Sequence, residues 1–198
     1  LLKKLKNDLE VDLQIFKQDK NIGLEKNSLF LLKKANKDFV MFLGDDDFLS
    51  QDLLEEIIKL IESKDYDCII PKKVAIDPEG KIIIRKDIKN PEGTFQSGYL
   101  TLKKINYLCH SMAGLTFRKE KVYEKYIQNK VSNLYPFVFF GAINMLRGNT
   151  IILNSFPVYG TIPYKKTLTE ENVRDWNYGK DGLVSDFFDN YNKIPGLN

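Results

Sequence analysis

Three consecutive carboxylates, Asp45, Asp46 and Asp47, follow almost directly on the apolar run "FVMFL" at residues 39–43. Carboxylates this close repel one another and resist burial, so their position at the end of a core strand calls for a positive partner. Hard divalent cations prefer oxygen ligands, and Mg²⁺ usually keeps coordination places for substrate phosphates. We therefore predict a Mg²⁺ or Mn²⁺ site that faces a phosphorylated ligand.

Two other interpretations of the acidic run are weaker. An exposed loop that caps the next helix through the helix dipole needs one aspartate and not three. An EF-hand loop requires a glycine and a bidentate glutamate at fixed spacing, and the residues after Asp45 provide neither.

A general base is harder to find in the sequence. The chain has one histidine, His110, and a histidine side chain titrates near neutral pH, which suits a base. Glu92, Asp87 and Asp77 are the other candidates, because they lie in or after a predicted hairpin. A single histidine is more often structural than catalytic, so the residue types alone leave the choice open.

The elements that must position these residues alternate along the chain. Apolar runs bounded by polar residues indicate strands, and apolar residues at helical spacing indicate helices. Ser50 is the expected N-cap of a helix with the buried stripe Leu53, Leu54, Ile57, Ile58 and Ile61. Strands are predicted at 11–18, 38–43, 67–76, 112–119 and 150–160, helices at 1–9, 25–35, 51–63, 101–108, 120–129 and 137–148, and a hairpin arm at 81–88.

This order predicts an α/β fold: a mostly parallel sheet flanked by helices, with an added β-hairpin and a C-terminal mixed region. Neither an internal repeat nor a linker is visible, so we expect a single domain over residues 1–198. The aromatic side chains of Tyr135, Phe137, Phe139 and Phe140 have helical spacing and are expected in the core, although an acceptor groove is the alternative.

The composition is that of an ordinary globular protein, with 43% hydrophobic and 29% charged residues. The net charge of +3 is small and the lysines are spread along the chain, so we expect no nucleic acid partner. Cys68 and Cys109 lie in apolar surroundings and are expected to be buried free thiols. The longest uncharged stretch, 131–146, falls short of the ~20 apolar residues of a spanning helix.

Two segments, "NIGLEKN" at residues 21–27 and "KDFVMFLGDDDFLSQDLLEEI" at 37–57, together resemble the family 2 glycosyltransferases of the GT-A fold. The family pattern is an N-x-G turn, an Asn on the following helix, a strand that ends in a D-x-D motif, and a Leu–Leu helix. "LGDDDFL" is similar to the abequosyltransferase-like subgroup of bacterial surface-polysaccharide assembly. The resemblance covers residues 11–71.

The resemblance implies roles for particular residues. Asn21, Gly23 and Asn27 correspond to the turn and helix beside the donor nucleotide. Among the aspartates, Asp46 is the expected metal ligand, with Asp47 beside it, whereas Asp45 is expected at the donor and able to shift to the metal. Residues 1–75 would form the donor and metal half, and residues 76–198 the acceptor-side half and tail.

The function implied is metal-assisted, inverting transfer of a sugar from a UDP- or GDP-type nucleotide-sugar to a glycan or lipid-linked acceptor. Such an enzyme is expected in the cytoplasm, with peripheral contact at the inner face of the membrane. Two rivals stay open. One is a non-catalytic carbohydrate- or metal-binding domain, and the other is a nucleotidyltransferase, although no Gly-rich phosphate loop is visible.

The chain departs from the family pattern in two places. The opening strand and helix of the family would precede "NIG" by more residues than are present, so we expect this chain to be a fragment. The family base is usually an acid near the segment that reads "SNLYPFVFFG" here, and no Asp or Glu occurs between Glu124 and Glu170. His110 is therefore the substitute we favour. Arg118, Lys119 and a lid with Lys165 and Lys166 are further candidates for phosphate contact, and Trp176 for a sugar platform.

Overall fold

The structure is a computed structural model that describes residues 12–83, 91–161, 183–194 and 196–197. The helix predicted at 1–9, the end of the hairpin arm with Asp87, the lid lysines Lys165 and Lys166, and Trp176 lie outside the described residues. The elements are α2 (Gly23–Lys34), β1 (Phe39–Met41), β2 (Asp47–Leu49), α3 (Gln51–Ser63), β3 (Tyr66–Ile76), β4 (Gly93–Phe95), α4 (Tyr99–Ile105), the 3₁₀ helix η1 (Asn106–His110), β5 (Thr116–Arg118), α5 (Val122–Gln128), α6 (Pro136–Arg147), β6 (Asn149–Thr161) and α8 (Leu183–Asn192).

The described strands form one sheet with the order β1-β5-β3-β6-β2. The long strand β6 pairs with β3 along one edge, and its other edge carries β4 against residues 150–152 and β2 against 158–160. The α/β class is confirmed, but the sheet is mixed rather than mostly parallel. Among the described pairings only β3 with β6 is parallel.

The position of β5 explains this difference. β1 and β3 run in the same direction, as a strand–helix–strand pattern predicts. They are not neighbours, however, because β5 returns from η1 and inserts between them, antiparallel to both. An apolar run such as "GLTF" indicates a strand but carries no information on its direction, so the sequence did not predict this insertion.

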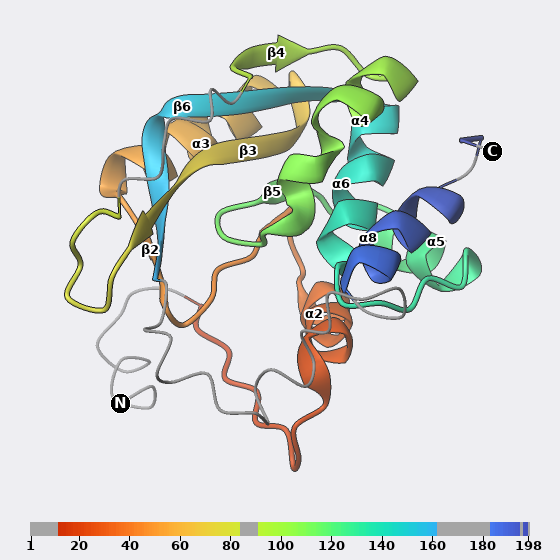
Figure 1. Ribbon diagram of the computed structural model, residues 1–198, viewed down its shortest axis with the longest axis horizontal. Coiled ribbons are helices and arrows are strands. Elements are labelled where there is room, and N and C mark those ends of the chain that lie inside the picture. Colours follow the sequence, from red (N-terminus) through yellow and green to blue (C-terminus); the bar gives the residue numbers. More distant parts are fainter. Residues whose placement is uncertain (1–11, 84–90, 162–182, 195, 198) are drawn as a thin grey trace.

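Helices cover both faces of the sheet. Alternate residues of β3 enter two different cores, since successive side chains of a strand point to opposite faces. Ile69 packs with Leu53 and Ile57 of α3, whereas Cys68 and Ile70 pack with side chains of α4 and α6. In Figure 1, α3 lies behind β3 and β6, and α4 and α6 lie on the other side.

Most of the predicted elements are present. Ser50 caps α3 through a hydrogen bond from the Leu53 amide to its Oγ (3.2 Å), as predicted. Phe137, Phe139 and Phe140 are buried, which confirms the predicted core packing of these three side chains and not the alternative of an acceptor groove. Cys68 and Cys109 are buried free thiols, as expected.

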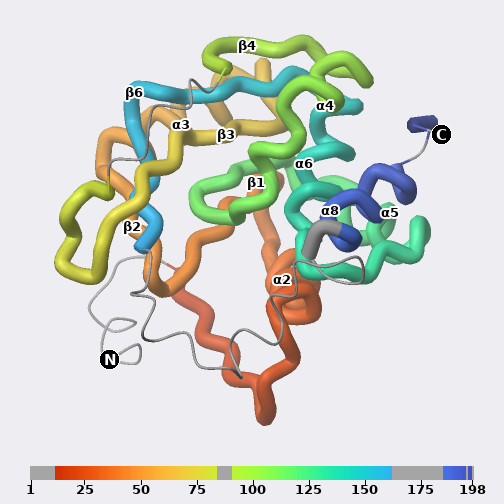
Figure 2. Tube along the Cα trace, in the orientation of Figure 1, coloured from red at the N-terminus to blue at the C-terminus, as the bar shows by residue number. Residues whose placement is uncertain are grey.

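Three details differ from the prediction. Residues 12–18 form no strand, because they pair with no described strand. Instead the ring of Phe16 packs edge-to-face on that of Phe30 in α2, with 5.3 Å between the ring centroids. The segment runs along the lower edge of the molecule in Figure 2. Leu54 and Ile58 are 42% and 46% exposed, because α3 contacts the sheet along a narrower stripe than its sequence contains. β2 is an additional strand that begins at Asp47 itself. None of the helices in the described parts of the chain is long and apolar enough to cross a membrane.

Candidate active site

A tight turn between β1 and β2 presents the three aspartates. The Asp47 amide donates to the Gly44 carbonyl (3.4 Å), which places Asp45 and Asp46 at the centre of the turn. The carbonyl of Asp46 accepts hydrogen bonds from the amide (3.3 Å) and the hydroxyl (2.6 Å) of Thr161, so the end of β6 holds the turn in place. Asp45 and Asp46 are exposed, whereas Asp47 is half-buried.

Gly44 allows two of the carboxylates to fold back over the turn. A Cβ atom at this position would lie 2.8 Å from Asp46 Oδ1 and 2.8 Å from Asp47 Oδ2, so both oxygens face the same space above the glycine. Asp47 Oδ2 also accepts a hydrogen bond from the Gly44 amide (2.9 Å). A side chain here would push the two carboxylates away, so this arrangement of the turn depends on glycine at position 44.

The charge of the turn favours a cation. Burial raises the pKa of the Asp47 carboxyl above its ordinary value; the Gly44 amide opposes this shift and the charge of Asp46 adds to it. No group of three His, Cys, Asp or Glu side chains in the described residues is arranged to hold a metal ion. Mg²⁺, however, is usually bound by one or two carboxylates together with water and substrate phosphates. Asp46 and Asp47 therefore fit a cation that binds together with a diphosphate, and not a preformed cage of three aspartates.

The other predicted donor residues surround one pocket. Asn21 Oδ1 accepts a hydrogen bond from the Gly23 amide (2.9 Å), and Gly23 adopts a positive φ of 79° at the start of α2. The open pocket beside this turn has a volume of about 280 Å³ and is lined by Gln18, Lys20, Asn21, Ile22, Gly23, Leu24 and Asn27. The three aspartates are not among its lining residues.

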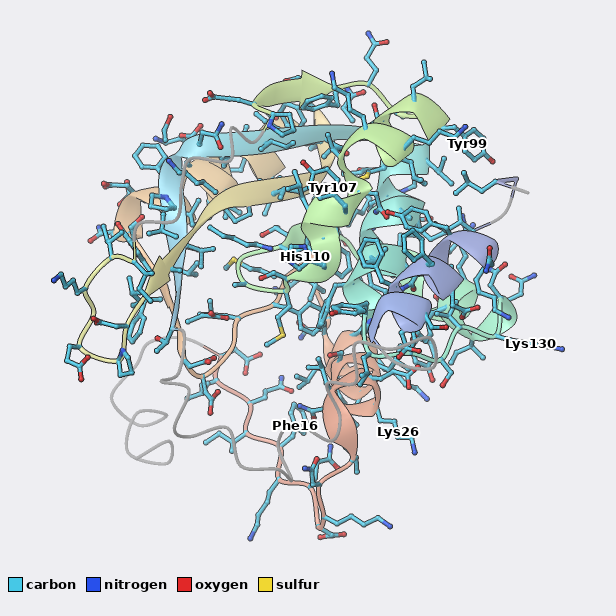
Figure 3. The ribbon with its side chains drawn as sticks, in the orientation of Figure 1. Phe16, Lys26, Tyr99, Tyr107, His110 and Lys130 are labelled. Carbon is cyan, nitrogen blue, oxygen red and sulfur yellow. The ribbon has the colours of Figure 1, made fainter. Side chains whose placement is uncertain are left out.

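His110 ends η1 on the face of the molecule shown in Figure 3. Its ring nitrogen Nδ1 lies 2.7 Å from the carbonyl oxygen of Tyr107. Because a carbonyl only accepts hydrogen bonds, Nδ1 carries the proton and Nε2 of the neutral ring keeps its lone pair. The residue as a whole is exposed, but neighbouring atoms cover part of the ring, and this partial burial lowers the pKa of His110. The Tyr107 carbonyl raises this pKa and the charge of Lys73 lowers it further. The ring is therefore neutral at pH 7 and able to accept a proton.

The loop after His110 lies against the strand that leads to the aspartates. The Gly114 amide donates to the Phe42 carbonyl (2.9 Å), and the Phe42 amide donates to the Leu115 carbonyl (3.3 Å). Met112 Cε would lie 3.3 Å from a Cβ at Gly44. The structure thus brings the segment that carries His110 beside the Gly44–Asp47 turn, although the two regions are far apart in the sequence.

Lys73, a half-buried lysine of β3, was not among the predicted site residues. Its ammonium group donates to the carbonyl oxygens of Leu108 and Ser111. Burial lowers the pKa of Lys73 to about 8, and the charge of Asp47 is among the influences that oppose this shift. An alternating pattern in "PKKVAI" with a lysine at an inward position was the only available signal.

Two acids also reach the segment where the family pattern places its base. Glu25 Oε1 accepts hydrogen bonds from the Tyr126 hydroxyl (2.7 Å) and the Asn133 amide (3.1 Å). Asp186 of α8 accepts from the Leu134 amide (2.9 Å). The segment before α6 thus contains no acid of its own but receives one carboxylate from α2 and one from α8, which no sequence spacing could indicate.

The remaining candidates lie elsewhere. Asp77 Oδ1 accepts from the amides of Glu79 (3.1 Å) and Lys81 (2.8 Å) and so shapes the predicted hairpin turn. Glu92 is exposed just before β4, at the edge of the sheet opposite β1.

The two basic residues at the end of β5 are occupied by structural contacts. Arg118 lies over the ring of Phe39 and forms an ion pair with Asp67 (2.5 Å). Asp67 also pairs with Arg147 (2.8 Å). Lys119 donates to the carbonyl of Ala35. Both side chains therefore make contacts within the chain near the start of β1, away from the aspartates that follow its end, and their contact with a phosphate stays a prediction.

Comparison with known proteins identifies the family and the fold of this chain. The family model "Glycosyl transferase family 2" matches residues 1–124, and the chain belongs to this family. No curated protein matches the chain with significant sequence similarity.

The solved structures that resemble this chain include several of one staphylococcal protein. The crystal structure of S. aureus TarS residues 1–349 in complex with UDP-GlcNAc matches with a TM-score of 0.56 and 19% identity, over 81% of this chain and 45% of that one. The complex of TarS 1–349 with UDP matches with a TM-score of 0.55 and 18% identity, over 81% of this chain and 46% of that one. The longer S. aureus TarS structure matches with a TM-score of 0.55 and 18% identity, over 81% of this chain and 28% of that one. The chain thus spans less than half the length of these structures, and the similarity establishes the fold.

Proposed function

We propose that this chain is part of a metal-assisted, inverting glycosyltransferase that uses a nucleotide-sugar donor. The observation that carries this proposal is the pair of carboxylates, Asp46 and Asp47, folded over Gly44 at the end of β1 in a member of glycosyl transferase family 2. The TarS complexes with UDP-GlcNAc and UDP support a UDP-type donor over a GDP-type one. The acceptor proposed is a glycan or lipid-linked saccharide of bacterial surface-polysaccharide synthesis, reached from the cytoplasmic face of the membrane.

The donor is proposed to bind across the two regions described above. In this proposal the nucleoside binds in the pocket lined by Asn21, Gly23 and Asn27, and the exposed Asp45 contacts the donor. A divalent cation held by Asp46 and Asp47 would supply positive charge for the diphosphate that leaves. Without that charge, the three aspartates would repel the donor.

His110 is the proposed base. The acceptor hydroxyl oxygen attacks the anomeric carbon as the bond from that carbon to the diphosphate oxygen breaks, and the hydroxyl proton passes to Nε2. Attack from the face opposite the leaving group inverts the anomeric configuration. The Tyr107 carbonyl holds the proton on Nδ1, which leaves Nε2 with the lone pair that a general base needs.

Two rival functions make different predictions. A non-catalytic carbohydrate- or metal-binding domain would bind a nucleotide-sugar and never turn it over. A nucleotidyltransferase would release pyrophosphate from a nucleoside triphosphate. Product analysis with a panel of acceptors separates both rivals from a transferase.

The decisive experiment is calorimetric titration of UDP and GDP into the full-length protein, with Mn²⁺ and with a chelator. We expect metal-dependent UDP binding with Kd near ~10 μM, or about −7 kcal/mol, which Asp46→Asn abolishes. Asp52→Asn, an exposed aspartate in the first turn of α3, is the matched control and should bind as the wild type does. Metal-independent binding, or no binding of either nucleotide, would show that the aspartates do not hold a cation for a diphosphate and would contradict the proposal.

A further inference from the structure

Lys73 is a half-buried cation without a carboxylate partner within ion-pair distance in the described part of the chain. The ion pairs found there involve Lys59, Arg118 and Arg147. In the parallel pairing of β3 and β6, Lys73 lies opposite Val158. Two residues further along these strands, Ala75 lies opposite Gly160, which pairs with Asp47 of β2 on its other side. Burying a lysine is unfavourable unless its N–H groups are well satisfied, so its contacts need an explanation.

Those contacts converge on the end of η1. Nζ donates to the carbonyl oxygen of Ser111 (2.5 Å) and to that of Leu108 (3.3 Å). These two carbonyls flank Cys109 and His110 in the sequence. The last carbonyls of a helix lack partners within the helix, and a lysine ammonium group is a suitable donor to them.

The same ammonium group is close to the aspartate turn. The register of β2, β6 and β3 brings Lys73 within two residues of the row that contains Asp47, and the charge of Lys73 contributes to the lowered pKa of His110. The far end of the 108–115 segment is bonded to Phe42, two residues before Gly44. The segment with His110 is therefore attached at both ends: backbone pairing joins one end to the strand that leads to the aspartates, and the Lys73 side chain joins the other end to β3.

On the basis of the proposed function, we propose that Lys73 is a positioning residue, whose hydrogen bonds to Leu108 and Ser111 hold the imidazole of His110 in register with the Gly44–Asp47 turn. Lys73 takes no proton and contacts no reacting atom in this role. Its effect falls on the geometry of the base, so it should appear in the catalytic rate more than in donor affinity. A misplacement of ~1 Å can cost about 100-fold in rate.

The test compares Lys73→Met, which keeps the aliphatic length and removes the donors, with Lys72→Met at the exposed neighbouring position. In the full-length protein we expect Lys73→Met to lower kcat about 100-fold while the Kd for UDP with Mn²⁺ changes less than about threefold. Lys73→Arg, which restores a charged donor, should recover part of kcat. Lys72→Met should match the wild type in both quantities.

A second readout does not depend on turnover. The ¹⁵N spectrum of the His110 imidazole reports which nitrogen carries the proton, and we expect Lys73→Met to change the tautomer ratio whereas Lys72→Met does not. An unchanged imidazole spectrum, or a kcat equal to that of the wild type, would overturn the positioning role. If Lys73→Met does not fold, Lys73→Gln, which keeps one donor without the charge, takes its place. A wild-type protein that binds UDP but transfers no sugar would instead contradict the proposed function, and the imidazole spectrum would still decide the role of Lys73.

Discussion

At residue scale, Gly44 controls the position of two neighbouring side chains by having none of its own. The space that a Cβ would fill is bounded by Asp46 Oδ1 and Asp47 Oδ2. Both atoms are the ends of short, movable side chains, so a substitution would displace them at a small cost in stability. The same displacement would separate the oxygens that are proposed to share a cation.

Gly44→Ala should therefore affect metal-dependent binding more than folding. We expect the Kd for UDP with Mn²⁺ to rise about tenfold, a loss of about 1.4 kcal/mol. The melting temperature should fall by no more than about 3 °C, which corresponds to roughly 1 kcal/mol for a domain of this size. Gly160→Ala should have a smaller effect, since its Cβ would meet only Asp47 Oδ1, at 3.3 Å, and a shift of a few tenths of an ångström relieves that contact. Equal effects of the two substitutions would contradict this role of Gly44.

The pKa of His110 gives a prediction with a definite sign. The proposed base acts only when its ring is neutral, and partial burial together with the charge of Lys73 lowers the pKa of this ring below 6.5. As the pH falls through this lowered pKa, the imidazole gains a proton and kcat should decline. The acid limb of the pH profile should thus lie below pH 6.5.

His110→Gln should remove this acid limb and reduce kcat by about 100- to 10,000-fold, the usual contribution of a general base. Donor affinity should stay close to that of the wild type, as measured by calorimetry. If kcat and its pH profile are unchanged in His110→Gln, the base is another group. Asp186→Asn would then be the next variant to assay, because Asp186 reaches the segment before α6.

At the scale of elements, α2 depends on a contact that is remote in the sequence. Its first turn borders the proposed nucleoside pocket, and Glu25 in that turn is bonded to Tyr126 of α5 and to Asn133. Burial, followed by the proximity of Glu25, raises the pKa of the Tyr126 hydroxyl, which therefore stays protonated and donates. Glu25 thus attaches the pocket side of the molecule to the α5–α6 segment.

Glu25→Ala should lower the free energy of unfolding by about 2–3 kcal/mol, because it leaves the buried Tyr126 hydroxyl without its acceptor. Glu55→Ala, at an exposed position of α3, should change it by less than about 0.5 kcal/mol. Urea denaturation of both variants measures the difference. A loss of similar size in the two variants would show that Glu25 does not attach α2.

At the scale of the whole molecule, ligand binding should stabilise the fold because the proposed site joins distant segments. The aspartate turn contacts β6 through Thr161, and the segment before β5 packs beside it. A ligand that bridges the turn and the α2 pocket would restrain both. Binding at 100 times Kd contributes about 2.7 kcal/mol to stability.

The melting temperature should therefore rise by about 5–10 °C with UDP and Mn²⁺ together, since each kcal/mol of stabilisation raises it by roughly 2–4 °C in a domain of this size. Mn²⁺ alone should have little effect, since no three acidic, histidine or cysteine side chains of the described residues gather around one point. Excess chelator should return the melting temperature to that of the free protein. A large shift with Mn²⁺ alone would indicate a preformed metal site and would contradict our interpretation of the turn.

The sequence by itself determined the local features: the α/β class, the Ser50 cap, the helix at Gly23–Lys34, the long strand at Tyr66–Ile76 and the burial of the α6 phenylalanines. Each of these depends on residues close together in the chain, through hydrophobic periodicity, capping or turn chemistry. The tertiary structure decided the insertion of β5 between β1 and β3, the approach of the His110 loop to Gly44, and the contacts of Lys73, Glu25 and Asp186. These contacts join residues 35 to 108 positions apart, and no local pattern encodes a strand's neighbour or the partner of a buried side chain.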